Sequence, residues 1–208
     1  MKTKSFILSS CVPLFAAFSS SASAVAIAEP FAYPESLLSG QPVKDKATAP
    51  GMSFGALKVE LEKTPIRELS KRLGAPLARE GKGDFTRDWT CLKNGRHAVW
   101  IIASDSAAVT EVQMAAQSEA SGKPGKCYAL PREFEAASIG GIVPGMKLSE
   151  ALARLGSPTY SSDDGWYFWS QYKTIEEYSN TRIQINWTGI QASNGKAVRI
   201  FSSQVTNP

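Results

Sequence analysis

The sequence contains a single histidine, His97, and none of the short motifs that mark common catalytic centres. Neither Gly-x-Ser-x-Gly, His-Glu-x-x-His nor a phosphate-binding glycine loop occurs. His97 begins an apolar stretch after a turn, which is typical of a structural strand residue. The carboxylates Asp84 and Asp88 are close in sequence, but no further group supports a role in hydrolysis. We therefore predict no catalytic residue and no enzyme activity.

Metal ligands are also scarce. One histidine disfavours a zinc site, and Asp163-Asp164-Gly165 lacks the spaced ligands and the distal glutamate of a calcium loop. This tripeptide is more typical of a turn. We expect neither a metal nor a cofactor.

Beyond the N-terminus, no apolar run approaches the roughly 20 residues that span a bilayer. Residues 1–26 themselves have the pattern of a signal peptide. Lys2 and Lys4 precede an apolar run over residues 6–18, and small residues at 22–26 offer a cleavage site. The pattern predicts a periplasmic or secreted protein without a stable membrane span.

An alternative interpretation makes Cys11 a lipidated residue, because Leu8-Ser9-Ser10-Cys11 resembles a lipoprotein box. Cleavage there would leave the apolar residues 12–18 on the mature chain, so we favour the ordinary signal peptide.

Strong charge of one sign is missing. The formal net charge is +4, and removing Lys2 and Lys4 with the signal leaves 23 − 2 = 21 basic against 19 acidic residues. No basic cluster is longer than Lys71-Arg72. The sequence therefore disfavours nucleic acid as a partner.

A Cys-x-x-Cys motif is also missing, so a redox site is disfavoured. After removal of the signal two cysteines remain, Cys91 and Cys127. An even number of cysteines in an oxidising compartment predicts a disulfide between them. Such a bridge would stabilise the fold by about 4 kcal/mol on the chain-entropy model.

A short sequence occurs twice, as Arg72-Leu73-Gly74-x-Pro76 and as Arg154-Leu155-Gly156-x-Pro158. Each copy ends a segment with apolar residues at helical spacing, over 66–73 and 148–155. A glycine that supplies a left-handed cap, followed by proline, is typical of a helix end. We also expect Thr64 to be the N-cap of the first helix, with Pro65 as its first residue.

Each predicted helix is followed by three stretches rich in aromatic and β-branched residues, at 85–92, 97–103 and 109–115, and at 166–172, 182–188 and 196–201. Asn94-Gly95 and Asn194-Gly195 predict tight type I′ turns. The pattern predicts an α+β fold of two tandem units, each a helix packed on a three- to four-stranded antiparallel sheet. The predicted parts are an extended proline-rich arm (27–52), unit one (53–126) and unit two (127–208). The two units would share a core or form one continuous sheet, because either alone is marginal in size.

The segment Gly145-Met146-Lys147-Leu148-Ser149-Glu150-Ala151, followed by Leu155-Gly156-Ser157-Pro158 and a three-stranded aromatic sheet, resembles a known repeat. It is similar to the unit shared by the β-lactamase inhibitory proteins and the small outer-membrane assembly lipoproteins of the SmpA/OmlA type. The resemblance implies a non-catalytic binder outside the cytoplasm. The inhibitors are tandem repeats that grip an enzyme with a concave sheet, and this chain is closer to them because it has two predicted units.

Aromatic residues gather in the last third of the chain. Because neighbouring strand residues point to opposite faces, the rings over 166–169 cannot all lie in one core. We predict that rings on one face bind a protein partner, in which case the protein is an inhibitor or, alternatively, an envelope-assembly accessory. The other possibility is that both faces are buried. The predicted partner-binding residues are Trp166, Tyr167, Trp169, Tyr172 and Trp187.

Overall fold

The computed structural model describes residues 26–38, 41–44, 50–104, 107–119, 125–177 and 180–207. The predicted signal peptide, except Ala26, and the alternative lipidation site Cys11 lie outside the described residues. Among the residues that are described, no helix is long and apolar enough to cross a membrane.

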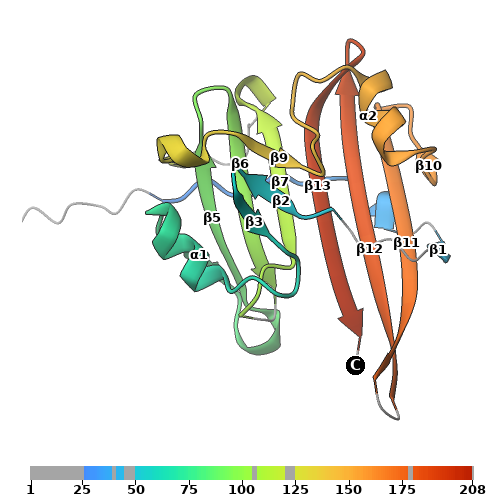
Figure 1. The fold of residues 1–208 in the computed structure, drawn as a ribbon, viewed down its shortest axis with the longest axis horizontal. Helices are drawn as coiled ribbons and strands as arrows, with labels where there is room; N and C mark the ends of the chain where they lie inside the picture. Colours follow the sequence, from blue (N-terminus) through green and yellow to red (C-terminus); the bar gives the residue numbers. More distant parts are fainter. Residues whose placement is uncertain are drawn as a thin grey trace, which may run out of the picture.

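One large mixed sheet of ten strands dominates the fold, in the order β1-β11-β12-β13-β7-β6-β5-β4, with β10 beside β11 and β8 beside β5 (Figure 1). Its strands are β1 (Val43–Lys44), β4 (Ala78–Glu80), β5 (Arg87–Lys93), β6 (His97–Ser104), β7 (Glu111–Ala116), β8 (Tyr128–Ala129), β10 (Tyr160–Ser161), β11 (Trp166–Glu177), β12 (Asn180–Ser193) and β13 (Lys196–Asn207). The short strand β1 pairs in parallel with β11, and the short strand β8 pairs in parallel with β5. All other pairs of strands in this sheet are antiparallel.

The remaining elements are small. A second sheet joins β2 (Met52–Phe54), β3 (Leu57–Val59) and β9 (Ala137–Ile139). Two α-helices, α1 (Ile66–Leu73) and α2 (Leu148–Leu155), accompany four 3-10 turns: η1 (Glu35–Leu38), η2 (Gly83–Phe85), η3 (Gln117–Glu119) and η4 (Arg132–Phe134).

The predicted arrangement of two helix-on-sheet units is wrong, because the protein is mostly β with one large sheet. β7 pairs with β13 from Glu111↔Ser203 to Ala115↔Arg199, so the two three-stranded meanders continue into each other. A separate unit would leave the edges of β7 and β13 unpaired, and pairing them satisfies both rows of backbone groups. The two helices and the six longer strands occur near the predicted positions.

The predicted helix ends are confirmed only in part. Gly74 has the left-handed conformation of a helix cap, with φ 65° and ψ 28°. Gly156 has φ 78° but ψ −166°, so the second helix ends differently. Thr64 is not the N-cap: that position is taken by Pro65, and the Thr64 hydroxyl accepts a hydrogen bond from the Glu60 N–H at 2.9 Å.

The two predicted tight turns also differ. Asn194 and Gly195 have φ of 50° and 71°, as a type I′ turn requires. At the other turn only Gly95 has a positive φ, 83°, and residues 94–96 separate β5 from β6. That turn is therefore not the predicted type I′ turn.

The large sheet carries a hydrophobic core on each face. We call the first the helix face, because α1, α2 and the small sheet pack on it. We call the second the strap face, because residues 26–38, here named the strap, cross it (Figure 1). The strap contributes the buried Phe31 and Leu37, and lies within the predicted arm 27–52. The boundaries of that arm and of the predicted units 53–126 and 127–208 stay predictions.

Candidate protein-binding face

Two of the five predicted partner-binding residues belong to the cores. Trp166 is 2% exposed on the strap face, where its ring lies 6.5 Å from Phe31 and 5.9 Å from Phe201. Trp169 is 5% exposed on the helix face, and its indole N–H donates to the Gly156 carbonyl at 3.3 Å. Neither indole offers a free surface. The alternative that both faces are buried therefore describes this end of β11.

The other three predicted residues separate between the faces. Tyr167 is partly buried and packs against the helix-face core. Tyr172 lies on the strap face because it follows Trp166 and Phe168 at even spacing along β11, and Trp187 lies there because it packs against the strap-face core. The structure thus brings Tyr172 and Trp187 together and keeps Tyr167 apart from them.

Around Tyr172 and Trp187 the strap face carries apolar side chains on three adjacent strands. Tyr172, Ile185 and Val205 are successive cross-strand neighbours on β11, β12 and β13. Ile183 and Val205 are 45% and 38% exposed, and the others are partly buried. We call this set the exposed patch; its members are Tyr172, Ile183, Ile185, Trp187 and Val205. Aromatic clustering misses the aliphatic members; alternation along β12 indicates Ile183 and Ile185, but not Val205 on β13.

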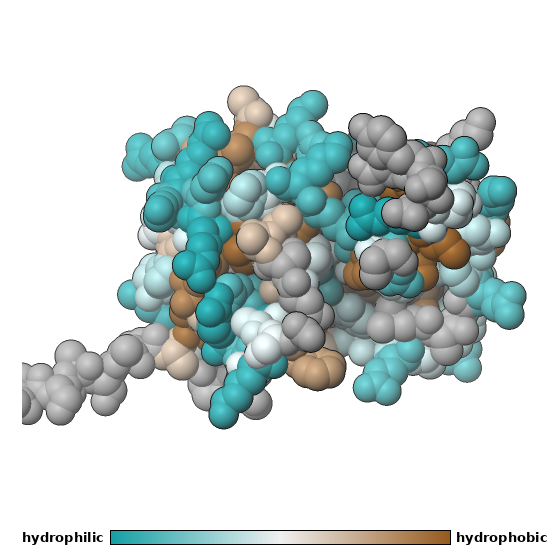
Figure 2. Space-filling view, turned by 90° about the horizontal axis from the view of Figure 1, so that it is seen from below, coloured by the Kyte–Doolittle hydropathy of each residue, from teal (hydrophilic) through white to brown (hydrophobic). Residues whose placement is uncertain are grey.

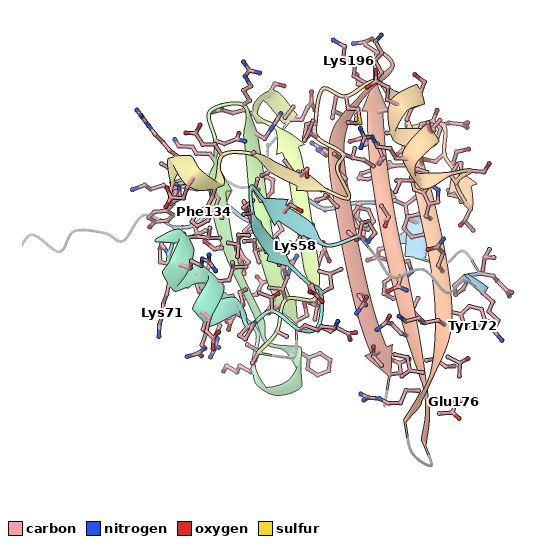
Figure 3. All side chains as sticks on the ribbon, viewed as in Figure 1. Lys58, Lys71, Phe134, Tyr172, Glu176 and Lys196 are labelled. Carbon is pink, nitrogen blue, oxygen red and sulfur yellow. A yellow bond between two sulfur atoms is a disulfide. The ribbon has the colours of Figure 1, made fainter. Side chains whose placement is uncertain are left out.

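The exposed patch lies toward the end of the sheet that holds the C-terminus and the β11–β12 hairpin. Figure 3 places Tyr172 and Glu176 on β11, in the half of the strand that approaches this end. Figure 2 views the molecule from this end, and brown hydrophobic atoms show between teal ones in its right half.

An open cleft of about 1010 Å³ lies where β13 runs past the start of β7. The residues that line it come from both faces of the sheet. Tyr33, Glu111, Trp187 and Val205 belong to the strap face, whereas Glu62, Gln184, Gln204 and Thr206 belong to the helix face. The exposed patch therefore continues into a recess with polar walls.

Glu62 connects the loop before α1 to the end of β13 across this cleft. Its carboxylate accepts hydrogen bonds from the Thr206 N–H and hydroxyl, both at 2.6 Å, and from the Gln204 and Gln184 amides at 2.8 and 3.3 Å. Its φ is 59°, a conformation uncommon for glutamate. The Glu62 side chain thereby accepts from the Thr206 N–H, which lies past Ser203, where the pairing of β13 with β7 ends.

We expect Glu62→Ala to lower the free energy of unfolding by about 2 kcal/mol, because donors at the cleft would lose a charged acceptor. Urea unfolding measures the change. Glu60→Ala is the matched control, since Glu60 pairs with Lys63 on the exposed surface, where an ion pair contributes little to stability. Equal effects of the two substitutions would contradict this role for Glu62.

Glu111 and Tyr33 form a second polar contact, at the rim of the strap face. The Tyr33 hydroxyl donates to Glu111 at 3.2 Å, and the Gln113 amide donates to the same carboxylate at 2.6 Å. Part of Glu111 remains exposed, but burial of its carboxyl group raises its pKa despite these donors and nearby Arg87. Burial raises the pKa of Tyr33 as well.

The raised pKa of Glu111 makes stability depend on pH. Since the folded protein holds this proton more tightly than the unfolded chain, the contribution is complete below the ordinary value of 4.5. It is lost as the pH rises through the folded pKa. Glu111→Gln should therefore raise the free energy of unfolding at pH 7 and flatten its fall above pH 4.5. Urea unfolding across pH 4 to 8 tests this, with exposed Glu176→Gln as the control. A wild-type slope that persists in the variant would contradict it.

Other titratable groups do not converge on a reaction centre in the described part of the chain. No group of three or more His, Cys, Asp or Glu could hold a metal there. His97 begins β6, where burial lowers its pKa and its Nδ1 has no hydrogen-bond partner. Asp88 binds the Arg79 guanidinium through both oxygens, at 2.6 and 2.7 Å, and this pair lowers its pKa. The side chain of Asp84 is outside the description.

The predicted disulfide is confirmed. Cys91 on β5 and Cys127 are bonded, with their Cα atoms 4.6 Å apart. The neighbouring Lys126 holds the strap, because its N–H donates to the Ala26 carbonyl at 2.8 Å and its carbonyl accepts from the Ala28 N–H at 3.2 Å. The disulfide therefore ties residues 126 and 127, and through them the strap, to the large sheet.

Fold and patch together define a sheet protein with a disulfide and an apolar surface open to contact. No family model matches the chain, and no curated protein matches it. One similar solved structure is a "putative beta-lactamase inhibitor protein" from Streptococcus mutans, with 14% identity over 83% of this chain and 93% of that chain. Its TM-score of 0.24 is too low to establish a shared fold. The resemblance of the sequence to the β-lactamase inhibitory proteins and to the SmpA/OmlA type therefore stays a prediction.

Proposed function

We propose that this chain is an exported, non-catalytic binding protein that holds a protein partner on the exposed patch. The observation that carries the proposal is the cross-strand cluster of Tyr172, Ile183, Ile185, Trp187 and Val205, part of which is open to solvent. Apolar side chains gathered on an open surface mark interaction sites more often than scattered ones do. Tyrosine and tryptophan are also enriched among the residues that dominate binding energy.

The patch is suited to rigid binding. Its residues lie on β11, β12 and β13, which pair over most of their length, so little conformational entropy is lost when a partner docks. Its action on a bound enzyme is inhibition by steric occlusion, because no covalent chemistry is available at the patch. The disulfide agrees with export, since such bonds persist outside the cytoplasm.

Affinity capture from the cell envelope and culture medium of the source organism tests the proposal. The wild type is compared with Tyr172→Ser/Trp187→Ser, and with a control that changes Lys173→Ser and the exposed Thr181→Ser on the same strands. We expect a partner that the wild type and the control retain and that the patch variant binds at least about 10-fold more weakly in calorimetry. If that partner is an enzyme, its turnover should fall with the wild type and not with the patch variant.

Two outcomes would overturn the proposal. A folded patch variant that retains the same partners at the same affinity would exclude the patch as the binding surface. A wild type that forms a dimer in light scattering, and a patch variant that is monomeric, would make the patch an interface between copies of the chain.

A further inference from the structure

The strap lies in a groove of aromatic side chains on the strap face. Phe31 meets Trp100 edge to face, with centroids 5.8 Å apart and an interplanar angle of 89°. Tyr33 stacks on Phe201 at 4.1 Å and 7°. Both rings contact side chains of the large sheet, so they point to the same side of the strap. The groove thus takes an aromatic-x-aromatic sequence.

The groove also binds the backbone of the strap through side chains. The Gln113 amide accepts from the Phe31 N–H at 3.0 Å and donates to the Phe31 carbonyl at 3.2 Å. The indole N–H groups of Trp89 and Trp100 both donate to the Ala28 carbonyl at 3.1 Å. These contacts are independent of the side chains of the bound segment, and backbone contacts of this kind give a peptide site affinity for varied sequences.

The strap is not a strand of the sheet. Among the described residues its regular structure is limited to one bridge, Ile27↔Lys126, and the turn η1. Its departure would therefore leave every strand pairing of the large sheet intact. An empty groove would expose Trp100, Trp166 and Phe201, at a large hydrophobic cost. Replacement by a similar segment avoids that cost.

We propose that the groove on the strap face is a binding site for an extended aromatic-x-aromatic segment of the partner protein, and that the strap fills it in cis until the partner's segment replaces it. The inference rests on the proposed function, because the groove and the exposed patch are continuous. Trp187 packs against the strap-face core and lines the cleft with Tyr33.

The side chains around the two rings define the preferred segment further. The Arg199 guanidinium lies 5.7 Å from the centroid of the Phe31 ring, and Glu111 accepts from the Tyr33 hydroxyl. The first aromatic position therefore suits any electron-rich ring, whereas the second favours tyrosine. A segment with phenylalanine at the second position would leave Glu111 without that donor.

The test uses the full chain and two fluorescent peptides. One has the sequence of residues 26–38, and the other keeps only its phenylalanine and tyrosine in a Gly/Ser/Lys background. The protein variant Phe31→Ser/Tyr33→Ser weakens the strap in cis. We expect both peptides to bind this variant with micromolar Kd. They should bind the wild type at least about 10-fold more weakly, because the tethered strap competes at high effective concentration. Adding Gln113→Leu to the variant should remove binding.

Failure of both peptides to bind a folded strap variant would overturn the inference. If that variant does not fold, the wild type replaces it, with millimolar peptide carrying benzoylphenylalanine at the position of Phe31. A photo-cross-link to β6, β11 or β13 is then the expected result, and its absence contradicts the inference. Binding of the 26–38 peptide alone, together with dimers that exchange straps, would assign the groove to a second copy of the chain.

The two proposals fail separately. Tyr172→Ser, at a patch residue that does not pack against the strap-face core, should reduce capture of the partner while peptide binding to the strap variant is unchanged within about 2-fold. If capture of the partner depends on the patch but the peptides do not bind, only the assignment of the groove is wrong. If the peptides bind but capture does not depend on the patch, only the proposed function is wrong.

Discussion

Trp100→Ala is expected to lower the free energy of unfolding by about 4 kcal/mol, the range in which buried tryptophan truncations fall. Trp100 is fully buried at the centre of the strap-face core and contacts Phe31. Its indole N–H donates to the Ala28 carbonyl, so the substitution removes both a packing surface and a strap contact.

Urea unfolding followed by circular dichroism measures the loss. Trp187→Ala is the matched control, because this partly exposed tryptophan of the exposed patch should cost about 1 kcal/mol or less. Amide exchange of residues 26–38 should also accelerate in Trp100→Ala and not in the control. Similar stability losses for the two variants would contradict the assignment of Trp100 to the core and of Trp187 to the surface.

Removal of the disulfide by Cys91→Ala/Cys127→Ala is expected to lower the free energy of unfolding by a similar amount, about 4 kcal/mol. The bonded residues are 36 positions apart, and closing a loop of this length restricts the unfolded chain by about that free energy. Alanine is chosen because Cys91 is fully buried, where a serine hydroxyl would add a separate cost.

Unfolding of the oxidised and reduced wild type provides the control, since reduction should reproduce most of the effect of the double substitution. The loss should reach the strap, because Lys126 beside the bridge hydrogen-bonds to Ala26 and Ala28. A loss below about 1 kcal/mol would show that the segment around Cys127 is held by its other contacts, including the parallel pairing of β8 with β5.

Local patterns predicted the local structure well. Apolar spacing located both helices, because periodicity reflects which side of an element is buried. Stretches rich in aromatic and β-branched residues located the six longer strands, because such side chains suit a pleated, half-buried surface. Gly74 confirmed its predicted cap, whereas Gly156 in the same short motif did not. The same short sequence allows its glycine more than one backbone conformation with positive φ. The residues that follow determine which conformation the glycine adopts.

The candidate site was only partly predictable. Alternation places Trp166 and Trp169 on opposite faces, and the structure agrees. It does not say what covers each face, so their burial could not be foreseen. The aliphatic members Ile183, Ile185 and Val205 carry no distinctive sequence signal beyond alternation. Their importance arises only when three strands align them beside Tyr172 and Trp187.

The sequence by itself determined the helices, the strands, the Asn194-Gly195 turn and the pairing of Cys91 with Cys127. The helices, the strands and the turn depend on residues close in sequence, and the disulfide follows because two cysteines allow only one pairing. Tertiary structure alone decided that β7 joins β13, that the strap covers Trp100 and Trp166, and that the surface around Trp187 stays open. Those outcomes depend on contacts between distant segments, such as Phe31 with Gln113 across 82 positions, which local periodicity does not encode.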